Sequence, residues 1–92
     1  MTALIATAVA FLSMGTAHRS IQTIERDYWH GGTTYVTDCH RHARNKVKCI
    51  AHTTIIEPGL KERITIPETV TLERGYIRVH PGAEVIESEE TL

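Results

Sequence analysis

The chain has 92 residues, of which 41% are hydrophobic, 23% charged and 5% aromatic, and its formal net charge at pH 7 is −1. A chain of this length forms one domain at most, and folding would bury only about sixty per cent of its surface. It contains no Gly-rich phosphate loop and no CxxC pair, so it lacks the sequence signatures of P-loop and thioredoxin-like chemistry.

The charge is distributed unevenly along the sequence. Residues 18–56 contain six Lys or Arg against three Asp or Glu, whereas residues 57–92 contain four against eight. Four of those acids lie in the last nine residues, so we expect residues 87–92 to form an acidic flexible tail. The basic half is the more informative one for function.

The amino terminus has the pattern of an export signal. An apolar run from Ala3 to Leu12 is followed by the small residues Gly15 and Ala17, which predicts a cleaved leader over 1–17 and a secreted mature protein. No Lys or Arg precedes the run, and a core helix in a cytosolic protein is the alternative. The run is about half of the roughly twenty apolar residues that a membrane span needs, so no transmembrane segment is predicted.

A short amphipathic helix is the first element expected after the leader. Its apolar residues recur at intervals of three and four: Ile21, Ile24 and Tyr28. Ser20 is the expected N-cap and Gly31-Gly32 the expected stop. Trp29, the only Trp, lies one position from the apolar stripe and is expected to cap the core.

A β-hairpin follows the helix. Residues 33–37 favour extended backbone, the chain turns at Ala43-Arg44-Asn45 with Asn45 in a left-handed conformation, and a second strand runs over 47–54. With Cys39 directly opposite Cys49, the pairing places Val36 opposite His52 and His40 opposite Lys48.

Cys39 and Cys49 are the only two cysteines. An even number of cysteines in an exported chain of this size indicates a disulfide. By the chain-entropy model, closing this loop should stabilise the fold by roughly 3 kcal/mol.

The segment from Ile21 to Ala51, a helix followed by a basic hairpin with two cysteines, resembles small exported proteins of actinobacteria. The resemblance implies export and the order of helix and hairpin. It implies no activity, because those proteins have no assigned function.

The second half of the chain has the pattern of further short strands. Pro58-Gly59 ends the hairpin, and the strand signals that follow are 63–66, 70–73, 76–79 and 85–86. Pro67 interrupts them and predicts an edge strand or a turn. We therefore expect a single α+β domain over 18–86, with one short N-terminal helix packed on a four- to five-stranded antiparallel sheet. The alternative is a parallel β-helix rung over 66–85.

The segment between the cysteines predicts an electrostatic binding element. It contains four cations and two histidines: Arg41, Arg44, Lys46, Lys48, His40 and His42. We expect it to bind an anionic macromolecule or an acidic protein surface, with Tyr35 as an apolar anchor. Below about pH 6.5 histidines protonate, which would strengthen such binding. No cofactor is predicted.

Two alternatives involve other chemistry. A metal-free nuclease would use Glu57, Arg63 and His80 as base, phosphate clamp and acid. A metal carrier would use a row of ligands on one strand: Asp38, His40 and His42. Lys46 and Lys48, expected opposite these histidines, would oppose cation binding, so no metal site is predicted.

Overall fold

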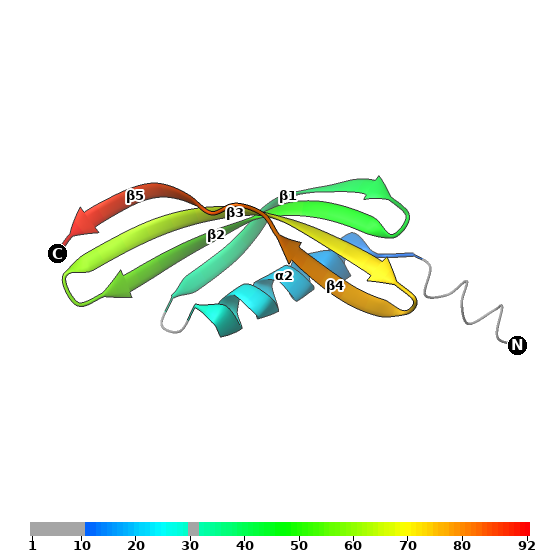
Figure 1. Ribbon diagram of the computed structural model, residues 1–92, viewed down its shortest axis with the longest axis horizontal. Helices are drawn as coiled ribbons and strands as arrows, with labels where there is room; N and C mark the ends of the chain where they lie inside the picture. The colour runs from blue at the N-terminus through cyan, green and yellow to red at the C-terminus, as the bar shows by residue number, and fades with distance from the viewer. Residues whose placement is uncertain (1–10, 30–31) are drawn as a thin grey trace, which may run out of the picture.

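The computed structural model describes residues 11–29 and 32–92, which form one helix followed by five strands (Figure 1). The helix α2 (Met14–Tyr28) packs on an antiparallel sheet, which confirms the predicted α+β fold. The strands are β1 (Thr33–Ala43), β2 (Lys46–Glu57), β3 (Leu60–Glu73), β4 (Tyr76–Pro81) and β5 (Val85–Thr91). The fold is elongated, 58 × 21 × 17 Å, because the long β2–β3 hairpin runs along it.

Three strands form the sheet along its whole length, and two shorter strands share the fourth place beside β3. β1, β2 and β3 lie side by side in this order. On the far side of β3, β4 pairs with its carboxyl-terminal half and β5 with its amino-terminal half. All of these pairs are antiparallel, so the alternative of a parallel β-helix rung is wrong.

Pro67 lies inside β3, where the sequence predicted an edge strand or a turn. It is paired with Ile50 of β2, and it stands where the other neighbour of β3 changes from β4 to β5. The Pro67 carbonyl accepts a hydrogen bond from the Gly82 N–H at 2.7 Å. Since the N and C=O groups of a strand residue face the same neighbour, the nitrogen of Pro67 faces the β4–β5 connection. The pairing with β2 therefore loses no hydrogen bond.

The helix begins earlier than predicted. Ser13, not Ser20, is its N-cap, because the Ser13 Oγ accepts a hydrogen bond from the Thr16 N–H at 3.1 Å. Ser20 lies within the helix, and its hydroxyl donates to the Thr16 carbonyl. Gly31 of the predicted stop lies outside the described residues. The buried stripe of the helix consists of Ala17, Ile21 and Glu25.

The segment around the predicted cleavage point contributes to the core. Leu12 and Ala17 are 1% and 0% exposed, and the Leu12 N–H donates to the Arg44 carbonyl at 2.8 Å. Cleavage after Ala17 would divide the helix and remove Leu12 from the core. Residues 1–10 lie outside the described residues, so the leader stays a prediction. Among the described residues, no helix is long and apolar enough to cross a membrane.

The β1–β2 hairpin contains a β-bulge at Asp38, whose φ of 55° is left-handed. After the bulge, His40 lies opposite Lys48, as predicted. Before it, the pairing is shifted by one residue from the prediction, and Val36 lies opposite Ala51. Because a shift of one residue exchanges the two faces, it turns Val36 toward the helix, where it is 7% exposed.

The predicted disulfide between Cys39 and Cys49 is present, with the Cα atoms 4.0 Å apart. The loop beyond it is shorter than predicted, since Arg44-Asn45 alone connect β1 to β2. Asn45 is not left-handed: among the described non-glycine residues, only Asp38 and Arg74 have positive φ.

The core lies between α2 and one face of the sheet, which we call the inner face. Its strand residues alternate along β1, β2 and β3: Val36, Val47, Cys49, Ala51, Ile64, Ile66 and Val70. Trp29 packs against this cluster, as predicted. The helix also covers the free edge of β1, because His18 and Gln22 hydrogen-bond its outward carbonyls. The opposite, uncovered side of the sheet is the outer face.

The predicted acidic tail is instead a strand. Residues 85–91 form β5, and Lys61 of β3 lies opposite Glu90. The Leu92 N–H continues the pairing with a bond to the Gly59 carbonyl at 3.0 Å. Main-chain hydrogen bonds of a ladder do not depend on side-chain type, so an acidic sequence can pair where a neighbouring strand offers a free edge.

Candidate functional site

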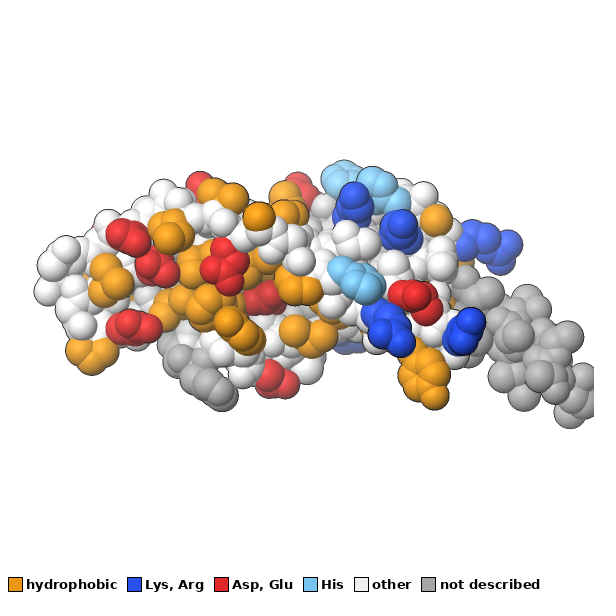
Figure 2. Space-filling model, viewed as in Figure 1, with side chains coloured by type: hydrophobic (Ala, Val, Ile, Leu, Met, Phe, Trp, Pro, Cys, Tyr) orange, Lys and Arg blue, Asp and Glu red, His pale blue; other side chains and the backbone are white. Residues whose placement is uncertain are grey.

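Basic residues from three strands meet on the outer face at one end of the sheet. In-register residues of neighbouring antiparallel strands lie on the same face. One row across the sheet is His40, Lys48, Thr69 and His80, and the next is Lys46, Thr71 and Arg78. We call their basic residues the basic face: His40, Lys46, Lys48, Arg78 and His80. Figure 2 shows Lys, Arg and His side chains gathered at this end of the molecule, around a carboxylate.

The basic face is open to solvent. All five of its residues are exposed. Adjacent strands lie about 4.8 Å apart and alternate residues on a strand about 7 Å apart, so the backbone positions, which run from β1 across β2 and β3 to β4, cover roughly 14 by 7 Å. Lys46 and Lys48 have no ion-pair partner in the described part of the chain. Their charge is therefore available to a ligand.

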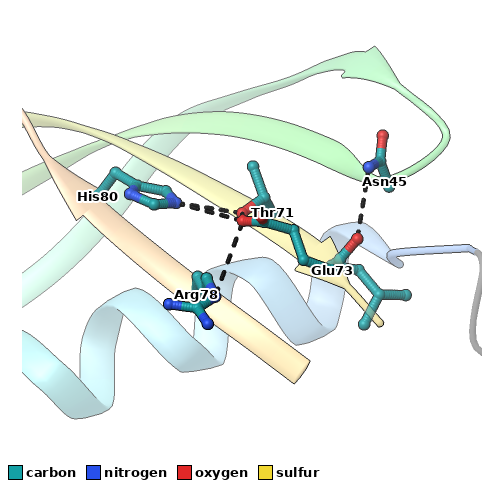
Figure 3. A network of polar contacts seen from close by, with 6 residues as sticks. Asn45, Thr71, Glu73, Arg78 and His80 are labelled. Atoms are coloured by element: carbon teal, nitrogen blue, oxygen red, sulfur yellow. Dashed lines mark hydrogen bonds and ion pairs between the residues drawn. The ribbon is translucent and has the colours of Figure 1, made fainter. Parts of the chain in front are cut away.

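A single carboxylate, Glu73, organises the β4 side of the basic face (Figure 3). The Thr71 hydroxyl donates to Glu73 Oε2 at 2.7 Å. Arg78 Nε and His80 Nε2 lie 3.9 and 3.7 Å from the same oxygen. The Thr71 hydrogen bond, and then the Arg78 charge, lower the pKa of Glu73. Glu73 therefore stays ionised and holds Arg78 and His80 over the sheet.

Asn45 joins the loop between β1 and β2 to the same region. Its side-chain amide donates to the Leu72 carbonyl at 3.3 Å, and its main-chain carbonyl accepts from the Leu72 N–H at 2.9 Å. These bonds fix the position of Lys46, the next residue, relative to β3. The lysines of β2 and the basic residues of β4 are thus held on one surface.

A shallow depression of about 620 Å³ borders the basic face. Its outer-face lining includes His40, Lys48, Ile50, Pro67 and Thr69. The apolar surface of Ile50 and Pro67 lies beside two basic groups. Such a surface can contact the uncharged backbone of a ligand while Lys48 and His40 contact its negative charge.

Arg41, predicted to bind a partner, is engaged within the molecule. It lies opposite Val47, on the inner side of the hairpin. Its guanidinium donates to the carbonyls of Leu12, Ala43 and Arg44, at 2.5, 3.0 and 3.1 Å. It also lies 4.4 Å from the centre of the Phe11 ring. Arg41 therefore anchors the segment before α2 to the hairpin.

Of the other predicted binding residues, two lie beside the basic face and one lies away from it. Arg44 and His42 are exposed at the loop end of the hairpin, beside the basic face. Tyr35 stacks on His52, with ring centres 4.7 Å apart, and lines a separate depression of about 390 Å³ with Arg63. Tyr35 is five residue steps along β1 from His40 of the basic face, about 17 Å of strand.

Arg78 and His80 are the members of the basic face that the prediction of a binding hairpin missed. The signal was present in the alternation Arg78-Val79-His80, which places both basic side chains on one face of a strand. The pattern predicts an edge strand or a turn at Pro67, so it does not predict that the strand beside β4 continues through Pro67 and also pairs with β2.

Neither alternative active centre is assembled. Arg63 is itself on β3, whereas His80 lies opposite Thr69 of β3, and these two β3 positions are six residue steps apart, about 20 Å. Glu57 lies at the far end of β2. Within residues 11–29 and 32–92, no group of three or more His, Cys, Asp or Glu side chains could hold a metal ion.

No protein-family model, curated protein or solved structure matches this chain. Its function is therefore argued from its own residues.

Proposed function

We propose that the protein binds an anionic macromolecule through the basic face. The observation that carries the proposal is the convergence of His40, Lys46 and Lys48 with Arg78 and His80 on an uncovered sheet surface. Exposed cations contribute little to stability, so their concentration on one surface favours a role in recognition.

The spacing of the cations favours a ligand with repeated negative charges. The positions of the basic face span roughly 14 Å across the sheet, which is farther than one phosphate or sulfate group can reach. A nucleic acid, an acidic wall polymer or an extended acidic protein segment could contact several of them at once.

We also propose that the protein works outside the cytosol, and the disulfide supports this location. Disulfides persist mainly in oxidising compartments. Cys49 is 2% exposed, so the bond forms part of the core of the fold. An intact mass of the natively produced protein would report whether the leader is cleaved and whether the disulfide is closed.

The binding proposal is tested with fluorescently labelled heparin as the probe. Anisotropy should show saturable binding that weakens steeply between about 50 and 200 mM salt, because cation contacts release counterions. Replacing Lys46 and Lys48 by Ser should lower the affinity at least tenfold and reduce the salt slope by roughly one for each lysine removed. The tip variant Arg44→Ser/Lys46→Ser should also bind more weakly than the wild type.

The matched control is Arg26→Ser/Lys61→Ser. It removes the same formal charge from α2 and from the other end of β3, and it should bind heparin within about twofold of the wild type, since distant charges are screened. If this control lost as much affinity as the variant in which Lys46 and Lys48 are replaced by Ser, the effect would depend only on net charge, and this would contradict a defined site. All of these variants should melt within a few degrees of the wild type.

A further inference from the structure

A second, smaller pocket lies away from the basic face, between α2, the middle of β3 and the β4–β5 connection. Its volume is about 240 Å³. Its apolar lining comes from Ile24, Ile66 and Pro81, and its aromatic lining from Tyr28 and Trp29. Tyr28 and Ile24 are 68% and 46% exposed, so the pocket is open to solvent on the helix side.

Two carboxyl groups line this pocket, and one of them is buried. Glu25 is 4% exposed, and the Trp29 indole N–H donates to its Oε2 at 2.6 Å. This hydrogen bond holds the Glu25 carboxyl against the aromatic wall. Glu84, from the β4–β5 connection, is exposed and adds a second carboxyl at the rim. No Lys or Arg is among the described residues that line the pocket.

A second buried carboxyl group, that of Glu68 on β3, lies next to Glu25. It is 2% exposed, and neither of its carboxyl oxygens has a hydrogen-bond partner among the described residues. Burial, and then the neighbouring Glu25, raise the pKa of Glu68 to about 8, so it is neutral at pH 7. Neither Glu25 nor Glu68 has an ion-pair partner among the described residues, although buried carboxylates in proteins are normally paired.

We propose that this pocket binds a primary alkylammonium group, such as the end of a lysine side chain. The ammonium would lie between Glu25 and Glu84 and supply the missing positive charge. Its aliphatic stem would pack on Ile66 and Pro81, and the aromatic rings would favour a cation over a neutral group of the same shape. The site is independent of the basic face, because it recognises the opposite charge on the other side of the sheet.

Trp29, the only Trp in the chain, is a built-in reporter for this site. We would titrate the protein with Nα-acetyl-lysine amide and with n-butylammonium while following Trp fluorescence. The neutral control ligand is Nα-acetyl-norleucine amide, which has nearly the same stem and no charge. The amines should give a saturable change that the control ligand does not give. Binding of both amines identifies a side-chain site, and binding of butylammonium alone identifies a small-amine site.

Two variants locate the binding. Glu25→Gln keeps an oxygen that can accept the Trp29 hydrogen bond but removes the charge, so it should lower the affinity for the amines at least tenfold. Glu84→Gln changes an exposed residue and should lower it severalfold. If the Glu25 variant does not fold, the affinity of the Glu84 variant for the amines tests the proposal alone. An equal response to the norleucine ligand, or an unchanged affinity in Glu84→Gln, would overturn the proposal.

Discussion

The two faces of the sheet are built from alternate residues of the same strands, and they differ in how they accommodate charge. On the outer face, Lys46 and Lys48 stand in solvent with no ion-pair partner among the described residues. On the inner face, Glu68 is covered by α2 and is held in its neutral form at pH 7.

A charged side chain on the outer face therefore costs little free energy of folding, whereas one on the inner face costs much. An exposed lysine keeps its water, so its neighbours scarcely change its free energy. A buried carboxyl loses its water, and it remains in place only if it takes up a proton or meets a cation. We expect changes on the inner face to alter stability and changes on the outer face to alter binding.

The largest expected effect is the pH dependence contributed by Glu68. Its pKa is about 8 in the folded protein and 4.5 for a free carboxyl, so the folded state holds the proton more tightly. The contribution of protonated Glu68 to the free energy of unfolding is fully present below pH 4.5 and is lost as the pH rises through about 8. Within this window, Glu68 should lower the free energy of unfolding by roughly 1.4 kcal/mol per pH unit in urea titrations.

Glu68→Gln should remove this slope, since the amide does not titrate. The matched control is Glu87→Gln, which changes an exposed carboxyl on β5 and should retain the wild-type slope. If Glu68→Gln and the wild type lost stability in parallel between about pH 6 and pH 8, the proposed cost of charge on the inner face would be wrong.

Removing the disulfide should have the next largest effect. Cys39→Ser/Cys49→Ser should lower the free energy of unfolding by roughly 3 kcal/mol, because the unfolded chain regains the freedom of the closed loop. Chemical denaturation of both proteins measures the difference. Reduction of the wild type by dithiothreitol should give a loss of stability of similar size. A loss below about 1 kcal/mol in both experiments would show that the hairpin is held by other contacts.

Within one hairpin, Arg41 stabilises the fold through hydrogen bonds, whereas Arg44 is exposed and available for binding. Arg41→Ala should cost about 1 to 2 kcal/mol, because it removes hydrogen bonds to three carbonyls. Arg44→Ala should change stability by less than about 0.5 kcal/mol, since its side chain is exposed. Thermal melts of the two variants, which differ from the wild type by the same charge, distinguish the two roles. Equal melting temperatures would contradict the anchoring role of Arg41.

The smallest expected effect is a gain in stability at the β3–β4 turn. Arg74 and Gly75 have φ of 52° and 81°, a conformation that Asn adopts more readily than Arg at the first position. Arg74→Asn should stabilise the fold by about 0.5 kcal/mol. Arg44→Asn is the control, because Arg44 has no positive φ and should show no gain. A denaturation midpoint for Arg74→Asn below that of the wild type would contradict this assignment.

The fold class and the disulfide could be predicted from the sequence because both depend on local signals. Strand propensity and the turns at Pro58-Gly59 and Gly75 correctly located the two ends of β3 and the start of β4. The two cysteines had only each other as partners. The path through Pro67 could not be predicted in the same way. A proline excludes a bond on one side of its strand, and the sequence does not tell which side lacks a neighbour.

The basic face was predicted only in part for the same reason. His40, Lys46 and Lys48 were identified because they lie within one hairpin. Arg78 and His80 join them through the pairing of β3 with β4, which requires β3 to be continuous. The pairing shift at Asp38 and the hydrogen bond of Arg41 to the Leu12 carbonyl involve residues distant in the sequence. The start of α2 was missed because the apolar residues before it resemble a leader.

The most direct test of binding through the basic face is to map the heparin contact by NMR, using the side-chain signals of all lysines and histidines. We expect the signals of Lys46, Lys48, His40 and His80 to shift during the titration, while Lys61, at the other end of the outer face, stays unchanged. Shifts centred on Lys61, or spread evenly over the basic residues of the whole molecule, would contradict a binding surface at this end of the sheet.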